Sequence, residues 1–130
     1  MTLARLRCTL LAAALPIGLT GCSVTTAGGE RLRPRDPAFA DYVETVFRQQ
    51  NEAATALAFA LDETDFDSAR YRTLEATETA LLDACSELNA MATARQRANG
   101  DGPGGLSALR AARTAPDCER AAVAAAEVID

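Results

Sequence analysis

Cysteines, carboxylates and arginines are the side chains that could do chemistry in this chain of 130 residues. Histidine is absent, which removes the commonest general base at neutral pH and excludes Ser-His-Asp and Cys-His mechanisms. An enzyme with this composition would have to use carboxylates alone, as glycoside cleavage can. We therefore expect a protein that is not an enzyme and that uses neither a cofactor nor a metal.

Cys22 follows an N-terminal segment with the features of an export signal. Residues 1–7 form a short basic start, and residues 8–19 are apolar apart from Thr9, Pro16 and Gly18. This run is shorter than the about 18 to 20 apolar residues that span a bilayer, so a permanent transmembrane helix is disfavoured. The sequence predicts a signal peptide over residues 1–21, removed from the mature protein.

The residues Leu19-Thr20-Gly21-Cys22 resemble the lipobox of bacterial lipoproteins, in which an aliphatic and two small residues precede the modified cysteine. The resemblance covers only the N-terminal end of the chain. It implies cleavage before Cys22 and acyl chains such as palmitate on that residue, which would hold the protein on a membrane essentially permanently. Ser23, in place of an aspartate, implies the outer membrane and a periplasmic domain. An uncleaved anchor and an ordinary signal with a chance cysteine are the alternatives.

The mature chain is one small acidic domain behind a tether. Without Arg5 and Arg7, 11 arginines are set against 18 acids, a net charge of −7 that makes nucleic acid a poor partner. Residues 22–35 are polar and contain glycine, so we expect a flexible, lipid-anchored tether there. The helical domain would then occupy residues 36–130.

Three stretches of that domain repeat apolar residues at helical spacing. The sequence contains 29 alanines, which favour helix, and we expect helices over residues 37–61, 68–98 and 106–129. Asp36-Pro37 and Asp67 or Ser68 would cap the first two, residues 99–105 would turn the chain, and Pro116 would kink or split the third. No strand pattern is evident. We predict an all-α, small antiparallel three-helix bundle.

Cys85 and Cys118 test this arrangement, because they lie equally far from the glycine-rich turn. Two residues of a helical hairpin are level when their distances from the turn match. In an exported protein we therefore predict a disulfide between them. A redox or metal-binding thiol pair is the alternative, but the chain has no Cys-x-x-Cys and no histidine to complete a zinc site.

The same rule separates the charges between the two ends of the bundle. The end near the turn and the tether would be basic, and the other end acidic. We hypothesise that the arginines contact anionic headgroups or an anionic ligand, the alternative being that they pair with acids and complement helix ends. The basic residues are Arg95, Arg97, Arg110 and Arg113, joined by Arg31, Arg33 and Arg35, and the acidic residues are Asp62, Glu63, Asp65, Asp67, Glu127 and Asp130.

Two further polar features are candidate sites. The acids of residues 62–67 resemble a calcium loop only superficially, because Ser68 and Leu74 stand where its glycine and glutamate belong. Gln50 falls on the seam of the bundle, and levelling places Glu78 opposite it, next to the alanines of residues 124–126. This polar layer would either bind a ligand or fix the register of the helices.

We therefore expect a lipid-anchored, non-enzymatic module of the cell envelope. It would bind another envelope protein through an exposed helix face or its acidic end. The alternative is a periplasmic binding protein for a small polar or cationic ligand, held at the layer around Gln50 and Glu78.

Overall fold

The computed structural model describes residues 23–97 and 105–130, with side chains from residue 109 onward in the second range. The predicted signal peptide, the lipobox with Cys22, and most of the glycine-rich turn lie outside these residues. The described elements are β1 (Val24–Thr25), β2 (Arg31–Leu32), α1 (Pro37–Asp62), α2 (Ala69–Arg97) and α3 (Gly105–Ile129).

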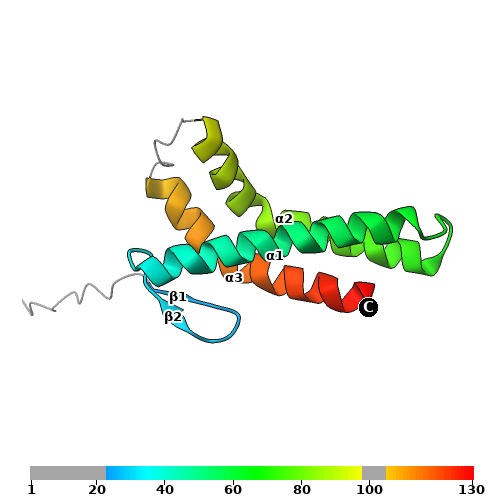
Figure 1. The fold of residues 1–130 in the computed structure, drawn as a ribbon, viewed down its shortest axis with the longest axis horizontal. Coiled ribbons are helices and arrows are strands. Elements are labelled where there is room, and N and C mark those ends of the chain that lie inside the picture. Colours follow the sequence, from blue (N-terminus) through cyan, green and yellow to red (C-terminus); the bar gives the residue numbers. More distant parts are fainter. Residues whose placement is uncertain (1–22, 98–104) are drawn as a thin grey trace, which may run out of the picture.

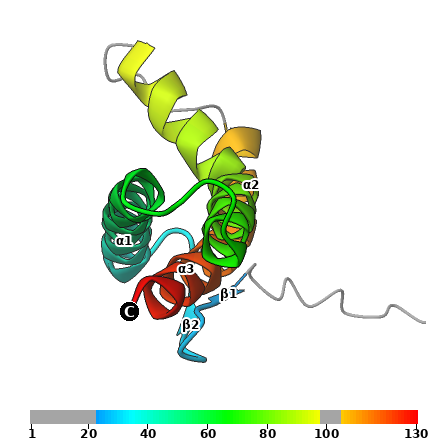
Figure 2. The same cartoon turned by 90° about the vertical axis from the view of Figure 1, so that its right-hand side faces the viewer.

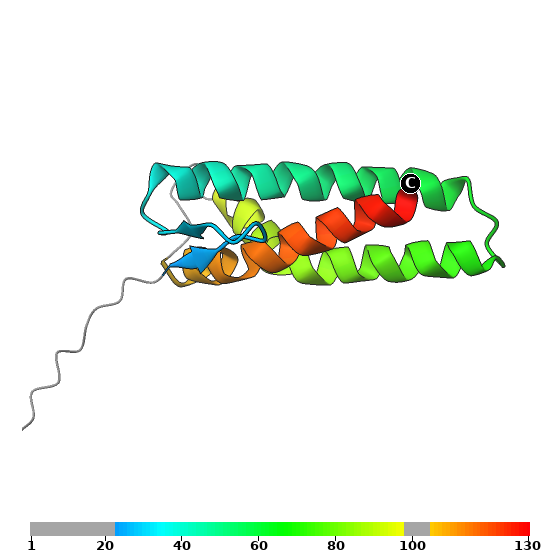
Figure 3. The same cartoon turned by 90° about the horizontal axis from the view of Figure 1, so that it is seen from below.

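The three helices form the predicted antiparallel bundle (Figures 1 and 3). α2 runs back along α1, and α3 returns in the direction of α1, so the C-terminus lies toward the end where α1 joins α2. Seen along the bundle, the helices surround a common core (Figure 2). Each observed boundary lies within one residue of its expected position.

Local signals explain where the helices begin. Pro37 occupies the first turn of α1 directly after the extended residue Asp36, whose side chain makes no capping bond. Ser68 caps α2, because its Oγ accepts a hydrogen bond of 3.0 Å from the N–H of Tyr71. The cap predicted at residues 67–68 is therefore confirmed at Ser68.

Large side chains from α1 and α2 pack against small side chains from α3 in the core. Because alanine has a short side chain, α3 approaches both other helices closely, and its contacts with each are more extensive than those between α1 and α2. The core cluster includes Val46, Leu57, Leu74, Leu81, Leu88, Ala111, Ala122 and Ala125.

The helices change direction where the bundle opens. α3 remains one helix through Pro116, but its first part runs at an angle to the rest (Figure 1). A proline in this position has no N–H for the helical hydrogen bond, which explains the expected kink. The C-terminal part of α2 turns away from α1 alongside the first part of α3 (Figure 1).

The segment expected to be a flexible tether and free of strands contains a β-hairpin that packs on the bundle. β1 pairs antiparallel with β2, with Val24 opposite Leu32, and both side chains are buried against Phe39 and Ala112. Gly29 allows the turn, because its φ of 85° lies in the left-handed region. The expectation for residues 24–32 was wrong because strands of two residues are too short to show an alternating pattern.

Candidate functional site

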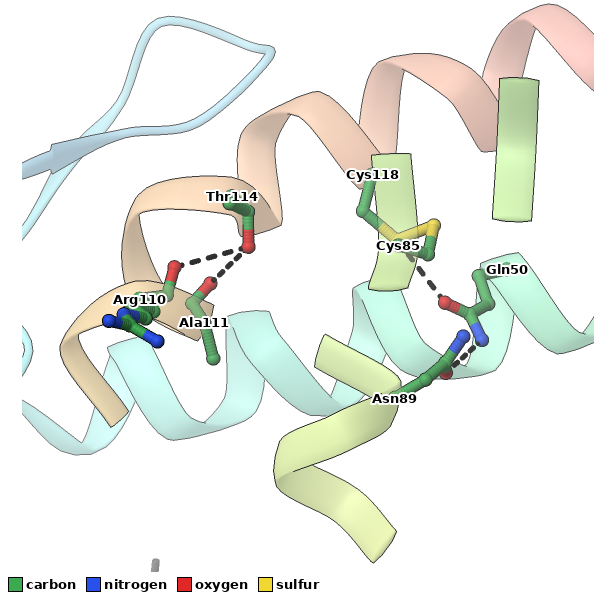
Figure 4. The surroundings of a disulfide bond; sticks show 7 residues. All are labelled: Gln50, Cys85, Asn89, Arg110, Ala111, Thr114 and Cys118. Atoms are coloured by element: carbon green, nitrogen blue, oxygen red, sulfur yellow. Dashed lines mark hydrogen bonds between the residues drawn. A yellow bond between two sulfur atoms is a disulfide. The ribbon is translucent and has the colours of Figure 1, made fainter. Parts of the chain in front are cut away.

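The disulfide and a polar pair lie together in the centre of the bundle (Figure 4). Cys85 of α2 and Cys118 of α3 form the predicted disulfide, with 4.6 Å between their Cα atoms. Gln50 of α1 is buried beside it, its Oε1 3.4 Å from the sulfur of Cys118. Its amide nitrogen donates a hydrogen bond to Oδ1 of Asn89.

The predicted polar layer is therefore half right. Gln50 is inside the bundle as expected, but its partner is Asn89 rather than Glu78, which is half-buried elsewhere on α2. Counting residues from the turn does not locate this contact, because Asn89 is eleven residues after Glu78 in α2. The amide pair links α1 to α2 beside the disulfide, which fits the fixing of helix register better than ligand binding.

The charged ends lie where the sequence places them. Arg95 and Arg97 are in the last turn of α2, Arg110 and Arg113 are exposed near the start of α3, and the hairpin and the start of α1 are at the same end of the bundle (Figure 3). Asp62, the last residue of α1, and the three acids of the following loop lie at the opposite end. At this end the guanidinium group of Arg70 in α2 donates a hydrogen bond to the backbone carbonyl oxygen of Ile129 in α3.

The acids of residues 62–67 are all exposed. Among the residues with described placement, no three cysteine or carboxylate side chains are grouped closely enough to hold a metal ion. The calcium-like spacing of residues 62–67 is explained by a solvated turn between helices.

A groove opens where α2 and α3 turn away from α1, and it was not predicted. Its volume is about 620 Å³, within the range of small-molecule sites. Arg95, Gln96 and Glu44 stand among its lining residues as its polar groups. The apolar lining comes from all three helices, with Phe39, Val43 and Phe47 from α1, Leu88 and Met91 from α2, and Ala111 and Ala112 from α3.

Comparison with known proteins adds no assignment. No protein family matches this chain, and no curated protein and no solved structure matches it either.

Glu119 holds the hairpin on the bundle, and this contact was not predicted from the sequence. Its Oε2 accepts hydrogen bonds from the N–H of Ala27 at 2.9 Å and from the hydroxyl of Tyr42 at 2.8 Å. One carboxylate therefore joins the hairpin, α1 and α3. No local signal points to this contact, because Ala27 and Glu119 are 92 residues apart.

This arrangement makes a pH prediction for Tyr42. Burial, followed by the hydrogen bond and negative charge of Glu119, raises the pKa of the Tyr42 hydroxyl well above its ordinary value of 10. Because the folded pKa is the higher one, this group stabilises the fold below about pH 10, and that stability is lost as the pH rises further. The chain has two tyrosines, so a Tyr71→Phe variant reports on Tyr42 alone. In this variant the absorbance of tyrosinate should appear at a higher pH than for free tyrosine.

Glu119→Gln is the matched change for this titration. It removes the negative charge, so the pKa of Tyr42 should fall but stay above 10, because burial is the larger cause and remains. Titration of Tyr42 at the ordinary tyrosine value in the Tyr71→Phe protein would contradict the described contact.

Proposed function

We propose that this chain is a bacterial lipoprotein, anchored in the outer membrane through acyl chains on Cys22, whose helical domain acts in the periplasm as a non-enzymatic interaction module. The observation that carries the proposal is the Leu19-Thr20-Gly21-Cys22 motif, placed directly after a basic start and a short apolar run. The absence of histidine from the sequence supports the non-enzymatic part.

The hairpin adds an orientation to this proposal. Val24 is packed into the domain only two residues after Cys22, a span of at most about 7 Å of extended chain. The acyl chains would therefore hold the basic end of the bundle against the membrane. The acidic end, with the loop of residues 62–67, would point away from the membrane toward an envelope protein partner.

This acidic end is the surface we assign to the partner. It carries exposed carboxylates together with exposed Phe59 and Phe66. Aromatic side chains are enriched in interaction surfaces, and the rim around them is polar. The alternative of a small polar ligand at Gln50 is not proposed, because that amide bonds to Asn89 within the bundle.

Fractionation of cells that express a Cys22→Ala variant tests the anchor. In cells grown with labelled palmitate, wild-type protein should be in the membrane fraction and carry the label, and the variant should carry none. Cys8→Ala is the matched control, because it removes the other cysteine of the N-terminal segment and should leave the distribution unchanged. Equal incorporation of labelled palmitate by Cys22→Ala and wild type would refute a lipid anchor at this residue.

A further inference from the structure

We propose that the groove between α1, α2 and α3 holds one acyl chain of an anionic phospholipid from the leaflet in which the protein is anchored. This inference rests on the proposed function, because the anchor at Cys22 brings the groove to the membrane. In this arrangement Arg95 lies beside the lipid phosphate, and the acyl chain lies between α1 and the diverging part of α2.

The lining of the groove favours a hydrocarbon chain. Three side chains from successive turns of α1, Phe39, Val43 and Phe47, face Leu88 and Met91 of α2 across it. Phe47 and Met91 are only half-buried, although each has a large apolar side chain. Burial of such surface is favourable, and flexible methionine adapts to a mobile chain.

The position of the groove makes the membrane its nearest source of such a ligand. Phe39 and Ala112 line the groove, and the same two residues pack against Val24 of the hairpin. The groove therefore lies at the end of the bundle where the chain arrives from Cys22. The acidic end, which would face away from the membrane, is at the far ends of α1 and α2 (Figure 3).

Charge complementarity selects an anionic headgroup. Arg95 is a lining residue, and Arg97, Arg110 and Arg113 are exposed on the same part of α2 and α3. Among the described residues the ion pair is Arg120 with Asp117, so none of these four arginines is paired within that part of the chain. Glu44 is the one acid of the lining and lies on the α1 side, opposite the helix that carries Arg95.

A single tryptophan provides the test, because the chain has none of its own. Phe47→Trp places a fluorescent reporter in the groove, and Phe59→Trp places one on an exposed position of the same helix at the other end. The lipidated full-length protein is reconstituted into phosphatidylcholine vesicles that contain phosphatidylglycerol. Bromine atoms, which quench tryptophan, are carried on the acyl chains of either one lipid or the other.

We expect brominated phosphatidylglycerol to quench Trp fluorescence at position 47 more strongly than brominated phosphatidylcholine, and to leave position 59 unquenched. Arg95→Gln should weaken the preference for phosphatidylglycerol about fivefold, which corresponds to the about 1 kcal/mol of one arginine near an anionic surface. Arg72→Gln, an equal loss of charge at the start of α2, should leave the preference unchanged.

Three results would overturn the proposal. Absence of quenching at position 47 would mean that no membrane chain enters, including the case in which the unbrominated chains of Cys22 fill the groove. Equal quenching by both lipids would show that the groove does not prefer an anionic headgroup. Equal quenching at positions 47 and 59 would show that the domain adsorbs to the membrane without a specific site in the groove.

A second tryptophan variant and a mass measurement distinguish failure of folding or of the anchor from failure of the proposal. Met91→Trp reports from the opposite wall of the groove if Phe47→Trp does not fold. The intact mass of each preparation shows whether Cys22 is acylated, so a failure of the anchor is recognised independently of the quenching result.

Discussion

Replacing Cys85 and Cys118 together by alanine should lower the free energy of unfolding by about 3 to 4 kcal/mol. The disulfide closes a loop of 33 residues that contains the turn from α2 to α3, and without it the unfolded chain regains that conformational freedom. The loss is large because a domain of this size has a small core. Urea unfolding, followed by circular dichroism at 222 nm, measures it.

Reduced wild-type protein is the control for this change. With dithiothreitol present, the wild type should unfold at nearly the same urea concentration as the double alanine variant, since both lack the crosslink. An oxidised wild type no more stable than the variant would show that the disulfide does not constrain the bundle.

Leu81→Ala should destabilise the domain by about 2 to 5 kcal/mol. The side chain of Leu81 is 1% exposed and belongs to the main core cluster, so its truncation both removes buried apolar surface and leaves a cavity. The alanines that α3 contributes to the same cluster have side chains too short to fill that cavity. The same urea experiment gives the change in unfolding free energy.

Leu82→Ala is a matched control one residue further along α2. Its side chain is 52% exposed, so the same truncation should change the unfolding free energy by no more than about 0.5 kcal/mol. Alanine also favours helix at least as well as leucine, which leaves the local conformation intact. Equal effects at positions 81 and 82 would contradict the described face of α2.

The helices and the disulfide are predictable because they depend on short-range pattern and simple geometry. Apolar steps of three and four residues locate the inner faces of the helices, and Pro37 and Ser68 mark the starts of α1 and α2. The equal distance of Cys85 and Cys118 from the turn then places them level in α2 and α3. That argument holds even though both helices change direction, because the two bend alongside each other.

The hairpin, the partner of Gln50 and the groove depend on contacts that no local pattern encodes. Val24 and Leu32 become a pair only because Phe39 and Ala112 provide a surface for them. Gln50 meets Asn89 through a contact between α1 and α2 that counting residues from the turn does not locate. The spacing of Val43 and Phe47 identifies an inner face of α1 but not whether α2 covers it.

The central claim is a disulfide-closed helical domain held on a membrane by Cys22, and intact mass spectrometry of the membrane fraction tests it most directly. The protein is measured with and without reductant, each followed by thiol alkylation. The account predicts a mass that begins at Cys22 and includes acyl chains, with Cys85 and Cys118 blocked from alkylation until they are reduced. An unprocessed chain that begins at Met1, with free thiols at Cys85 and Cys118, would contradict both parts.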